Sequence, residues 1–323
     1  MPWTAADIPD QTGRVALITG ASSGLGLETA RALVARGATV ILGCRSRERA
    51  ERARQELLPS AGAGGALDRL DLDLADLGSV QRAAAELADT YGRLDLLINN
   101  AGVMGLPRTL THDGFERQFG TNHLGHFALT TALLPLLRGR ADARVVTVTS
   151  GAQYFGRIDF DDPNGERRYD RWTAYGQSKL ANVMFALELQ ARLEAEGSAV
   201  RSLAAHPGLA RTNLQPASVA ASGSWFEPLA YRLMGPLFQS AAMGALPQLY
   251  AATAPEARAG GHYGPDQLGG MRGWPREARP APAALDAAQR QRLWQLSEEL
   301  CAAPPRPTAV AVSVADLPVA PGV

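Results

Sequence analysis

A tyrosine and a lysine four residues apart are the first residues of this chain that could do chemistry together. They are Tyr175 and Lys179 in the stretch T-A-Y-G-Q-S-K, and an apolar run, Leu180–Leu187, follows them. Positions i and i+4 of a helix lie on one face, so both side chains could point into one cleft. The same spacing also occurs by chance on solvated helices, so it needs support from other motifs.

An ammonium group beside a phenol changes what the phenol can do at neutral pH. A free tyrosine has a pKa of about 10. A positive charge ~4 Å away, at an effective dielectric of ~20, contributes about 4 kcal/mol, or roughly three pKa units. We therefore expect Lys179 to bring the pKa of Tyr175 close to neutral pH, where a general acid–base catalyst works best.

A glycine-rich turn near the amino terminus offers a second site. It reads T-G-A-S-S-G-L-G over residues 19–26, after a predicted strand and before a predicted helix. Glycines let the backbone approach a pyrophosphate, and the start of the helix supplies N–H donors. A tight structural turn is the alternative, but the flanking elements favour a dinucleotide site. The predicted contacts are Gly20, Ser22, Ser23, Gly24, Leu25 and Gly26.

The end of the next predicted strand indicates which dinucleotide binds. An NAD-binding chain usually places an Asp or Glu there to accept from the ribose hydroxyls, whereas a basic residue suits the 2′-phosphate of NADP. This chain has G-C-R-S-R at residues 43–47, and the guanidinium of Arg45 can bind a phosphate through paired hydrogen bonds. NADP(H) is therefore preferred, with NAD(H) possible. Alternatively, Arg45, Arg47 and Arg49 form only a solvated helix start.

Both sites need a framework, and the alternation along the chain predicts one. Short β-branched runs alternate with amphipathic stretches, which indicates right-handed βαβ units. We expect an α/β fold, a Rossmann-type doubly wound parallel sheet with helices on both faces. The predicted strands are Val15–Thr19, Thr39–Leu42, Leu67–Leu70, Leu94–Ile98, Val145–Thr149 and Val200–Ala205, and the predicted helices are Leu25–Arg36, Arg47–Leu57, Ser79–Tyr91, Asp113–Leu137 and Trp172–Glu194.

The chain of 323 residues is interpreted as one domain, residues 1–301, because single α/β domains of this size are common. An aromatic-rich insertion after the sixth strand, residues 213–246, lies where ligands of open sheets bind, so we expect a substrate lid there. Its apolar residues could also be core or an oligomer face. The proline-rich residues 302–323 are expected to form a disordered tail.

Charge and cysteine content narrow the function class. The 32 basic residues balance 32 acidic ones, which argues against nucleic acid as a partner. Cys44 and Cys301 are the only cysteines, and His123 and His126 lack a nearby third ligand, so neither a disulfide framework nor a metal site is expected. No signal-like or membrane-spanning run is present. We expect a cytoplasmic monomer or homodimer.

Six ordered motifs resemble the short-chain dehydrogenase/reductase family over residues 12–263. Besides the glycine turn and Y-G-Q-S-K, they are N-N-A-G at 99–102, T-N-H-L-G-H-F at 121–127, V-T-S ending at Ser150, and H-P-G-L-A-R-T at 206–212. The run C-R-S-R-E-R-A-E and the ending G-H-Y-G-P-D are similar to the branch of retinol dehydrogenase-like enzymes and bacterial carbonyl reductases.

The resemblance implies a role for each matched residue. Tyr175 would transfer the proton, and Lys179 would lower its pKa and hold the nicotinamide ribose. Ser150 would donate a hydrogen bond to the substrate oxygen, as suits a developing alkoxide, and Asn122 would anchor a water. Cofactor contacts are further implied at Asp73, Leu74, Asn99, Ala101, Gly102, Tyr175, Lys179, Pro207, Gly208 and Thr212.

The sequence thus predicts an NADP(H)-dependent oxidoreductase that transfers a hydride between nicotinamide and a bulky, apolar carbonyl or alcohol. Two alternatives stay open: an epimerase or dehydratase on the same scaffold, and a catalytically weak dinucleotide-binding sensor or interaction protein. The first usually has another glycine spacing, and the second would be free to lose Ser150, Tyr175 or Lys179. The long loop 154–172 is either a solvated excursion or a substrate contact.

Overall fold

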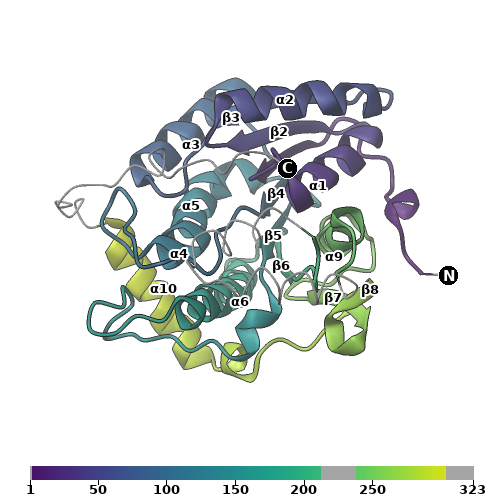
Figure 1. Cartoon of the computed structure of the whole chain (residues 1–323). Coiled ribbons are helices and arrows are strands. Elements are labelled where there is room, and N and C mark those ends of the chain that lie inside the picture. Colours follow the sequence, from purple (N-terminus) through teal and green to yellow (C-terminus); the bar gives the residue numbers. More distant parts are fainter. Residues whose placement is uncertain (1, 212–237, 303–323) are drawn as a thin grey trace, which may run out of the picture.

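The computed structural model describes residues 2–211 and 238–302, and its centre is one eight-stranded sheet (Figure 1). The strand order is β3-β2-β1-β4-β5-β6-β7-β8, and every pair is parallel except β7 with β8. The order reverses between β1 and β4, which makes the sheet doubly wound. The strands are β1 (Val15–Thr19), β2 (Thr39–Cys44), β3 (Ala66–Asp71), β4 (Leu96–Asn99), β5 (Arg144–Val148), β6 (Arg201–Ala205), β7 (His262–Gln267) and β8 (Arg272–Glu277).

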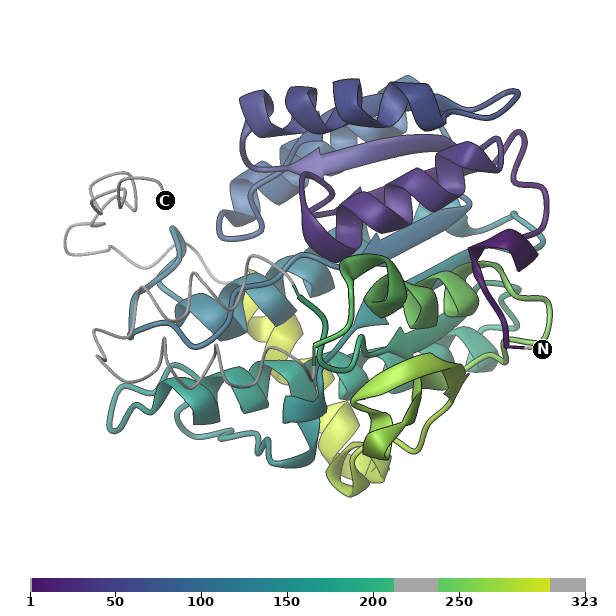
Figure 2. The same ribbon diagram turned by 45° about the vertical axis from the view of Figure 1, so that its right-hand side comes forward.

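Helices cover both faces of the sheet (Figure 2). On one face lie α1 (Gly24–Ala35), α2 (Arg47–Leu57) and α9 (Ala241–Thr253). On the other lie α3 (Leu77–Tyr91), α5 (Gly125–Leu137) and α6 (Arg171–Ala195), with α10 (Ala287–Ala302) packed on the outside of α6. The short elements are η1 (Ala5–Asp7), η2 (Leu58–Ser60), α4 (Arg117–Phe119), η3 (Gly120–Leu124), η4 (Gly151–Tyr154), η6 (Leu268–Gly270) and η7 (Pro282–Leu285).

The central strand β1 shows why these strands are continuous apolar runs. Ala16 and Ile18 pack into the core under α1, α2 and α9, whereas Val15 and Leu17 pack into the core under α3 and α5. A strand covered on both faces has no solvated side, so alternation with polar residues is lost. The predicted α/β fold with its doubly wound sheet is confirmed.

One predicted helix, Asp113–Leu137, is wrong as a single element. The chain there forms α4, a π-helical turn η3 and then α5. Gly125, at the start of α5, packs so closely on the backbone oxygen of Leu74 that a β-carbon would overlap it. A π-helical turn inside a helix is rare and is frequent at functional sites. Here the turn contains Asn122, a predicted catalytic residue.

Two strands were missed by the sequence analysis, which predicted six. β7 reads H-Y-G-P-D-Q and β8 reads R-G-W-P-R-E, so neither contains a β-branched residue and both contain a proline. The prolines are tolerated because β7 pairs with β6 only at His262 and Tyr263, and Pro265 faces Pro275 in the antiparallel pair. β8 is thus the edge strand, and Pro265 of β7 lies beyond the two residues that pair with β6.

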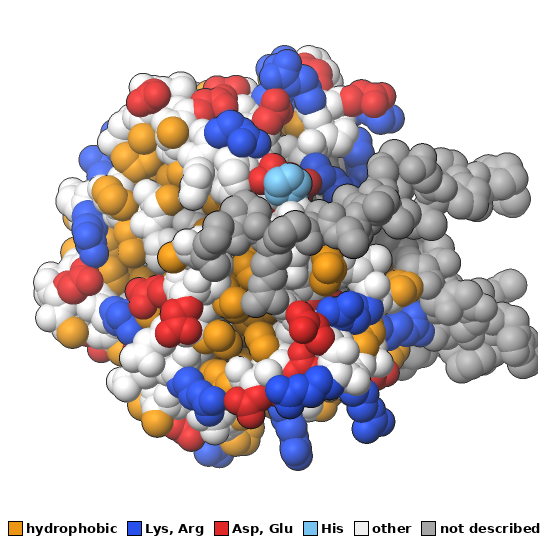
Figure 3. All heavy atoms as spheres, turned by 90° about the vertical axis from the view of Figure 1, so that its left-hand side faces the viewer, with side chains coloured by type: hydrophobic (Ala, Val, Ile, Leu, Met, Phe, Trp, Pro, Cys, Tyr) orange, Lys and Arg blue, Asp and Glu red, His pale blue; other side chains and the backbone are white. Residues whose placement is uncertain are grey.

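The predicted lid lies largely outside the described residues, because residues 212–237 are not among them. Residues 241–246 of the predicted lid instead begin α9, where Ala245 and Leu246 are buried. The predicted tail is also outside, except for Ala302, which ends α10. In the described ranges no helix is long and apolar enough to cross a membrane. On the face in Figure 3, basic and acidic side chains are interspersed.

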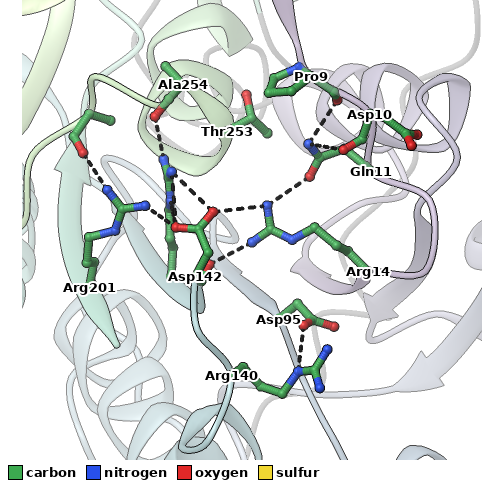
Figure 4. A network of polar contacts seen from close by, with 12 residues as sticks. Pro9, Asp10, Gln11, Arg14, Asp95, Arg140, Asp142, Arg201, Thr253 and Ala254 are labelled. Carbon is green, nitrogen blue, oxygen red and sulfur yellow. Dashed lines mark hydrogen bonds and ion pairs between the residues drawn. The ribbon is translucent and has the colours of Figure 1, made fainter. Parts of the chain in front are cut away.

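A charged network ties together the amino-terminal ends of the strands (Figure 4). The carboxylate of Asp142, just before β5, lies 3.6 Å from Arg14 and 3.3 Å from Arg144, and it also pairs with Arg201. Arg144 is 1% exposed and donates to the backbone oxygens of Ala251 and Ala254 at 3.0 and 2.8 Å. The network therefore joins the starts of β1, β5 and β6 to the end of α9.

Candidate active site

A cavity of about 320 Å³ lies at the opposite edge of the sheet, beyond the carboxyl ends of β1, β2 and β4. This is the point where the strand order reverses, which is where open α/β sheets bind their ligands. The predicted cofactor residues that line it are Gly20, Ser22, Ser23, Gly24, Leu25, Arg45, Asp73, Leu74, Ala101 and Gly102.

The glycine turn has the shape that a pyrophosphate requires. Gly20 has a φ of +67°, and a β-carbon on it would lie 2.9 Å from the Cα of Ala101. Ser23 is the N-cap of α1 but makes no side-chain capping hydrogen bond, so it leaves the first N–H groups of the helix to a ligand. Gly26 does not line the cavity; a β-carbon there would lie 2.6 Å from Asn100, so this glycine lets α1 pack closely on that residue.

The basic residues after β2 divide into two groups. Arg45 and Arg49 line the cavity, and neither has an ion pair within the described part of the chain. Arg47 instead pairs with Asp71 at 2.9 Å and is a solvated residue of α2. Arg47 fits the alternative of a solvated helix start, whereas Arg45 and Arg49 are exposed residues at the cavity. Arg49 was not predicted as a contact, although its position in the first turn of α2, four residues after Arg45, could have indicated it.

Tyr175 and Ser150 meet beside this cavity. Tyr175 is in the first turns of α6 and is 6% exposed, and the Ser150 hydroxyl lies close enough to the Tyr175 hydroxyl to lower its pKa. Ser150 follows β5 and is the N-cap of η4, where its Oγ accepts from the N–H of Ala152 at 3.3 Å. The structure thus brings together the predicted acid and the predicted oxyanion donor at the carboxyl end of a strand.

Lys179 joins this pair to the cavity. Its Nζ donates to the backbone oxygen of Val148 at 3.3 Å and lies 5.9 Å from the centre of the Tyr175 ring. It also lies 3.4 Å from where a β-carbon on Gly102, a cavity residue, would be. A larger residue than glycine at position 102 would crowd the ammonium group. Lys179 therefore lies between the phenol and the cavity.

The expected effect of Lys179 on Tyr175 is not seen. Burial raises the pKa of Tyr175, and the Ser150 hydrogen bond only partly opposes this. Burial also lowers the pKa of Lys179 to about 8. Both groups are removed from water, and desolvation disfavours the charged form of each. The sequence estimate considered only the attraction of two charges ~4 Å apart at a dielectric of ~20 and left desolvation out, so its direction differs.

Asn122 is held in place by three hydrogen bonds. Its Oδ1 accepts from the N–H of Val103 at 2.8 Å, and its Nδ2 donates to the oxygen of Val103 and the Oγ of Ser178, each at 2.9 Å. Ser178 is the neighbour of Lys179 in α6. The π-helical turn therefore places the Asn122 side chain between the loop after β4 and helix α6, which contains Tyr175 and Lys179.

Several predicted cofactor residues do not line the cavity. Asn99 is fully buried below it and donates to Thr130 Oγ1 at 2.9 Å. Pro207 accepts from Gln239 at 2.8 Å, and Gly208 follows it in the turn after β6. Thr212 lies outside the described residues. The cavity is also lined by Thr19, Asn100 and Thr121, which lie in the motifs but were not predicted as contacts, and by Val103, which directly follows N-N-A-G.

The long loop 154–172 is partly docked. Asn164 is 3% exposed and accepts from the N–H of Glu116 at 2.9 Å, and the Tyr169 hydroxyl bonds Glu116 at 3.0 Å. Phe155, in contrast, is 59% exposed, and Trp172 packs edge-on against Tyr175 with 6.4 Å between ring centres. The loop is therefore not only a solvated excursion, because its end brings aromatic surface to Tyr175.

One group in the described ranges has the composition of a metal site. Potential ligand atoms of Asp76, His112 and Asp113 lie within 4.8 Å of one another. Asp113 accepts from the N–H of Leu77 at 3.0 Å, and His112 lies 4.0 Å from Asp76. These contacts hold the start of α3 against the loop after β4. They give the group a structural role away from the reacting residues.

The fold and the site together define a class of protein. A doubly wound parallel sheet, a glycine turn at the reversal of strand order and a Ser–Tyr–Lys set with a buried tyrosine and lysine describe a dinucleotide-binding α/β enzyme. Comparison with known proteins gives the family. A family model of short chain dehydrogenases matches residues 14–222.

Relatives support the same assignment over most of the chain. Mouse retinol dehydrogenase 14 is 43% identical and covers 88% of this chain and 85% of its own. Mouse polyprenol dehydrogenase is 42% identical, covering 89% and 83%. A crystal structure of an uncharacterised protein from Mycobacterium paratuberculosis has a TM-score of 0.77 and 43% identity, covering 95% and 100%. This chain belongs to the short-chain dehydrogenase/reductase family, whose members are oxidoreductases with a nicotinamide cofactor.

Proposed function

We propose that the protein is an NADP(H)-dependent oxidoreductase that transfers a hydride between nicotinamide and a carbonyl or alcohol group, with Tyr175 as the general acid/base. The observation that carries this proposal is the contact between two sites. Lys179 lies on the same helix as Tyr175 and beside Gly102, which lines the dinucleotide cavity. Proton transfer and hydride transfer can therefore occur at one substrate carbon–oxygen bond.

Residues of the chain itself donate and accept the proton. A bound nicotinamide would supply or accept the hydride. In the direction of reduction, the Tyr175 hydroxyl donates its proton to the substrate oxygen while the Ser150 hydroxyl donates a hydrogen bond to the same oxygen. Because burial raises the pKa of Tyr175, the phenol is protonated at neutral pH. This state favours carbonyl reduction, and oxidation of an alcohol would first need the phenol to lose its proton.

The preference for NADP(H) rests on the charge around the end of β2. Arg45 and Arg49 line the cavity beyond this strand, so two guanidinium groups are in position to bind a 2′-phosphate. Asp71 could have accepted from a ribose hydroxyl, but it pairs with Arg47 at 2.9 Å. A related solved structure, the RhlG/NADP complex of Pseudomonas aeruginosa, has a TM-score of 0.61 and 25% identity, covering 78% of this chain and 94% of that one.

A bulky, apolar substrate is supported by two facts. Several relatives are named retinol dehydrogenases and one is named polyprenol dehydrogenase, and both names refer to apolar alcohols. The described surface near Tyr175 also includes the exposed aromatic side chains of Tyr154, Phe155 and Trp172. Exposed aromatic surface of this kind is typical of a binding site for an apolar ligand.

The test is a substrate screen with purified protein. Retinal, steroids, aromatic ketones and quinones are each incubated with NADPH, with NADH in parallel, and the loss of reduced-nucleotide absorbance is followed. We expect turnover with at least one apolar carbonyl, faster with NADPH at low nucleotide concentration, and abolished in Tyr175→Phe. Tight NADPH binding with no Tyr175-dependent turnover in either direction would instead identify a dinucleotide-binding sensor.

A further inference from the structure

His126 is a buried histidine that the proposed reaction does not use. It lies in the first turn of α5 and is 1% exposed. Its Nδ1 lies 2.9 Å from the backbone oxygen of Asn122, and its Nε2 lies 2.9 Å from Oγ1 of Thr19 at the end of β1. The ring therefore connects the turn that carries Asn122 to the strand that leads into the glycine turn.

The two partners fix where the hydrogens of this contact lie. A carbonyl oxygen can only accept, so Nδ1 of His126 carries a hydrogen and donates it to Asn122. Burial, with a smaller contribution from the charge of Lys179, lowers the pKa of His126 to about 4, so the ring is neutral at pH 7. Nε2 then has no hydrogen and must accept from the hydroxyl of Thr19.

This assignment completes the hydrogen bonds of Thr19. Its hydroxyl has one hydrogen and two lone pairs. The hydrogen goes to His126 at 2.9 Å, because the other acceptor in reach, the backbone oxygen of Ile98, is farther away at 3.4 Å. The backbone N–H groups of Asn100 and Ala101 both point to this oxygen at 2.9 Å. Asn100, Ala101 and Thr19 all line the dinucleotide cavity. The cavity wall after β4 is therefore held by a hydroxyl whose orientation is set by His126.

The other side of the ring leads to the reacting groups. The Asn122 side chain bonds Ser178, the neighbour of Lys179, at 2.9 Å. Its Oδ1 is also 3.2 Å from where a β-carbon on Gly102 would be. A continuous set of hydrogen bonds thus runs from the cavity wall through Thr19, His126 and Asn122 to the catalytic helix.

We propose that His126 is a positioning residue that couples the dinucleotide cavity to the placement of Asn122 beside Lys179. The inference rests on the proposed function, since it assigns a role within that catalytic site. His126 does not itself line the cavity, and it contacts neither Tyr175 nor Lys179 through a hydrogen bond. Its effect is instead exerted through the Thr19 hydroxyl on one side and the Asn122 backbone on the other.

The first experiment compares two buried histidines. His126→Phe keeps the ring volume but removes both hydrogen bonds, and we expect NADP binding to weaken about tenfold and kcat to fall about tenfold, because buried partners lose their hydrogen bonds. The matched control is His123→Phe. His123 is equally buried one turn earlier, but its Nε2 bonds Ser297 in α10, away from the cavity. The control should lower the thermal midpoint with binding and kcat within about threefold of the parent.

The second experiment removes the same hydrogen bond from its other end. Thr19→Val deletes the hydroxyl and should weaken NADP binding at least as much as His126→Phe, whereas Thr19→Ser keeps the hydroxyl and should preserve binding. The double variant Thr19→Val/His126→Phe should lose no more affinity than Thr19→Val alone, because both changes act on one chain of contacts. Additive losses would overturn the coupling.

NADP affinity is measured by calorimetric titration, so the test does not depend on knowing the substrate. If His126→Phe changes only the thermal midpoint, as His123→Phe should, then His126 is a structural histidine and the proposal is wrong. If the proposed function fails because no carbonyl is turned over, the affinity cycle between positions 19 and 126 still gives a result. The two failures are therefore distinguishable.

Discussion

Charged side chains have different partners at the amino-terminal and the carboxyl-terminal edge of the sheet. At the amino-terminal edge, Arg144 is 1% exposed, pairs with Asp142 and donates to two backbone oxygens. At the carboxyl-terminal edge, Lys179 is 4% exposed and donates to a single carbonyl at 3.3 Å, and Arg45 has no ion pair in the described part of the chain. The charges of the network at the strand starts are thus paired, whereas Lys179 and Arg45 have no ion pair in the described ranges, although Arg47 nearby pairs with Asp71.

The largest effect should come from Tyr175→Phe at the carboxyl-terminal edge. The change removes the proposed acid but keeps the ring, so we expect turnover to fall by about 10²–10⁴ while NADP affinity stays nearly unchanged. Steady-state kinetics and nucleotide titration of parent and variant measure both quantities. Activity within threefold of the parent would remove Tyr175 from the mechanism.

Arg45→Asp should change cofactor choice. The variant replaces a cation facing the 2′-phosphate with a carboxylate that repels it, and one charged hydrogen bond is worth about 1.5–3 kcal/mol. We expect the ratio of NAD to NADP dissociation constants to fall by roughly ten- to a hundredfold. The matched control is Arg47→Asp, which makes the same charge change at the solvated residue beside Asp71. An equal shift in both variants would mean that only general charge matters.

Lys179→Met should abolish activity but stabilise the fold. The pKa of Lys179 is lowered to about 8 by burial, below its unfolded value of about 10.4, so the charged side chain costs stability below pH 8. Removing the charge should raise the free energy of unfolding by about 1–3 kcal/mol at pH 7. The gain should decline between pH 8 and 10. Denaturant titration at both ends of that range is the measurement, and a less stable variant at pH 7 would contradict the comparison.

Asp142→Asn, at the amino-terminal edge of the sheet, should lower the free energy of unfolding, whereas Lys179→Met should raise it. It leaves Arg144 buried without its carboxylate, so we expect the free energy of unfolding to fall by about 1–3 kcal/mol, discounted because Asp142 is itself half-exposed. Turnover should be unchanged. Asp161→Asn is the control, because that carboxylate is 78% exposed and pairs only loosely with Arg292 at 3.7 Å. Its effect should stay below about 0.5 kcal/mol.

The pH dependence of the Asp142 contribution follows from its pKa. Burial raises the pKa of this carboxyl, but Arg144 and Arg201 lower it by more, so it lies below the ordinary value. A carboxyl with a lowered pKa contributes stability above its unfolded pKa of about 4 and loses it as the pH falls further. The difference between parent and Asp142→Asn should therefore be constant from pH 5 to 7 and shrink below pH 4. If the difference in the free energy of unfolding already decreased at a pH above 5, the stabilisation would belong to a group other than Asp142.

The fold was largely predictable because local and global signals agree in its first six strands. Val15–Thr19 and Arg47–Leu57 were predicted with the bounds that the structure has. The last two strands were not predicted, because Pro265 and Pro275 lower the strand propensity of their segments. These segments form strands only because they pair with each other beside β6. The π-helical turn was missed because it depends on the close approach of Gly125 to a distant backbone.

Site residues were predictable where they belong to a local sequence motif. The glycine turn, Arg45 and the Ser150–Tyr175 pair lie where the motifs indicate. The pKa of Tyr175 was not predictable, because burial is a property of the folded molecule and sequence spacing contains no information on it. The bond between His126 and Thr19 joins residues 107 positions apart, so no local pattern could have revealed it.

The packing of α10 has a consequence for how the molecule is made. Trp294 of α10 stacks on Phe185 of α6, with 5.8 Å between ring centres, and lies edge-on to Phe127 of α5 at 4.9 Å. Both phenylalanines leave the ribosome long before this tryptophan, so nascent chains carry an uncovered aromatic surface on the helices that hold Tyr175 and His126. That surface is where a chaperone would act, and a premature stop before Ala287 would leave the sheet complete but the product prone to aggregation.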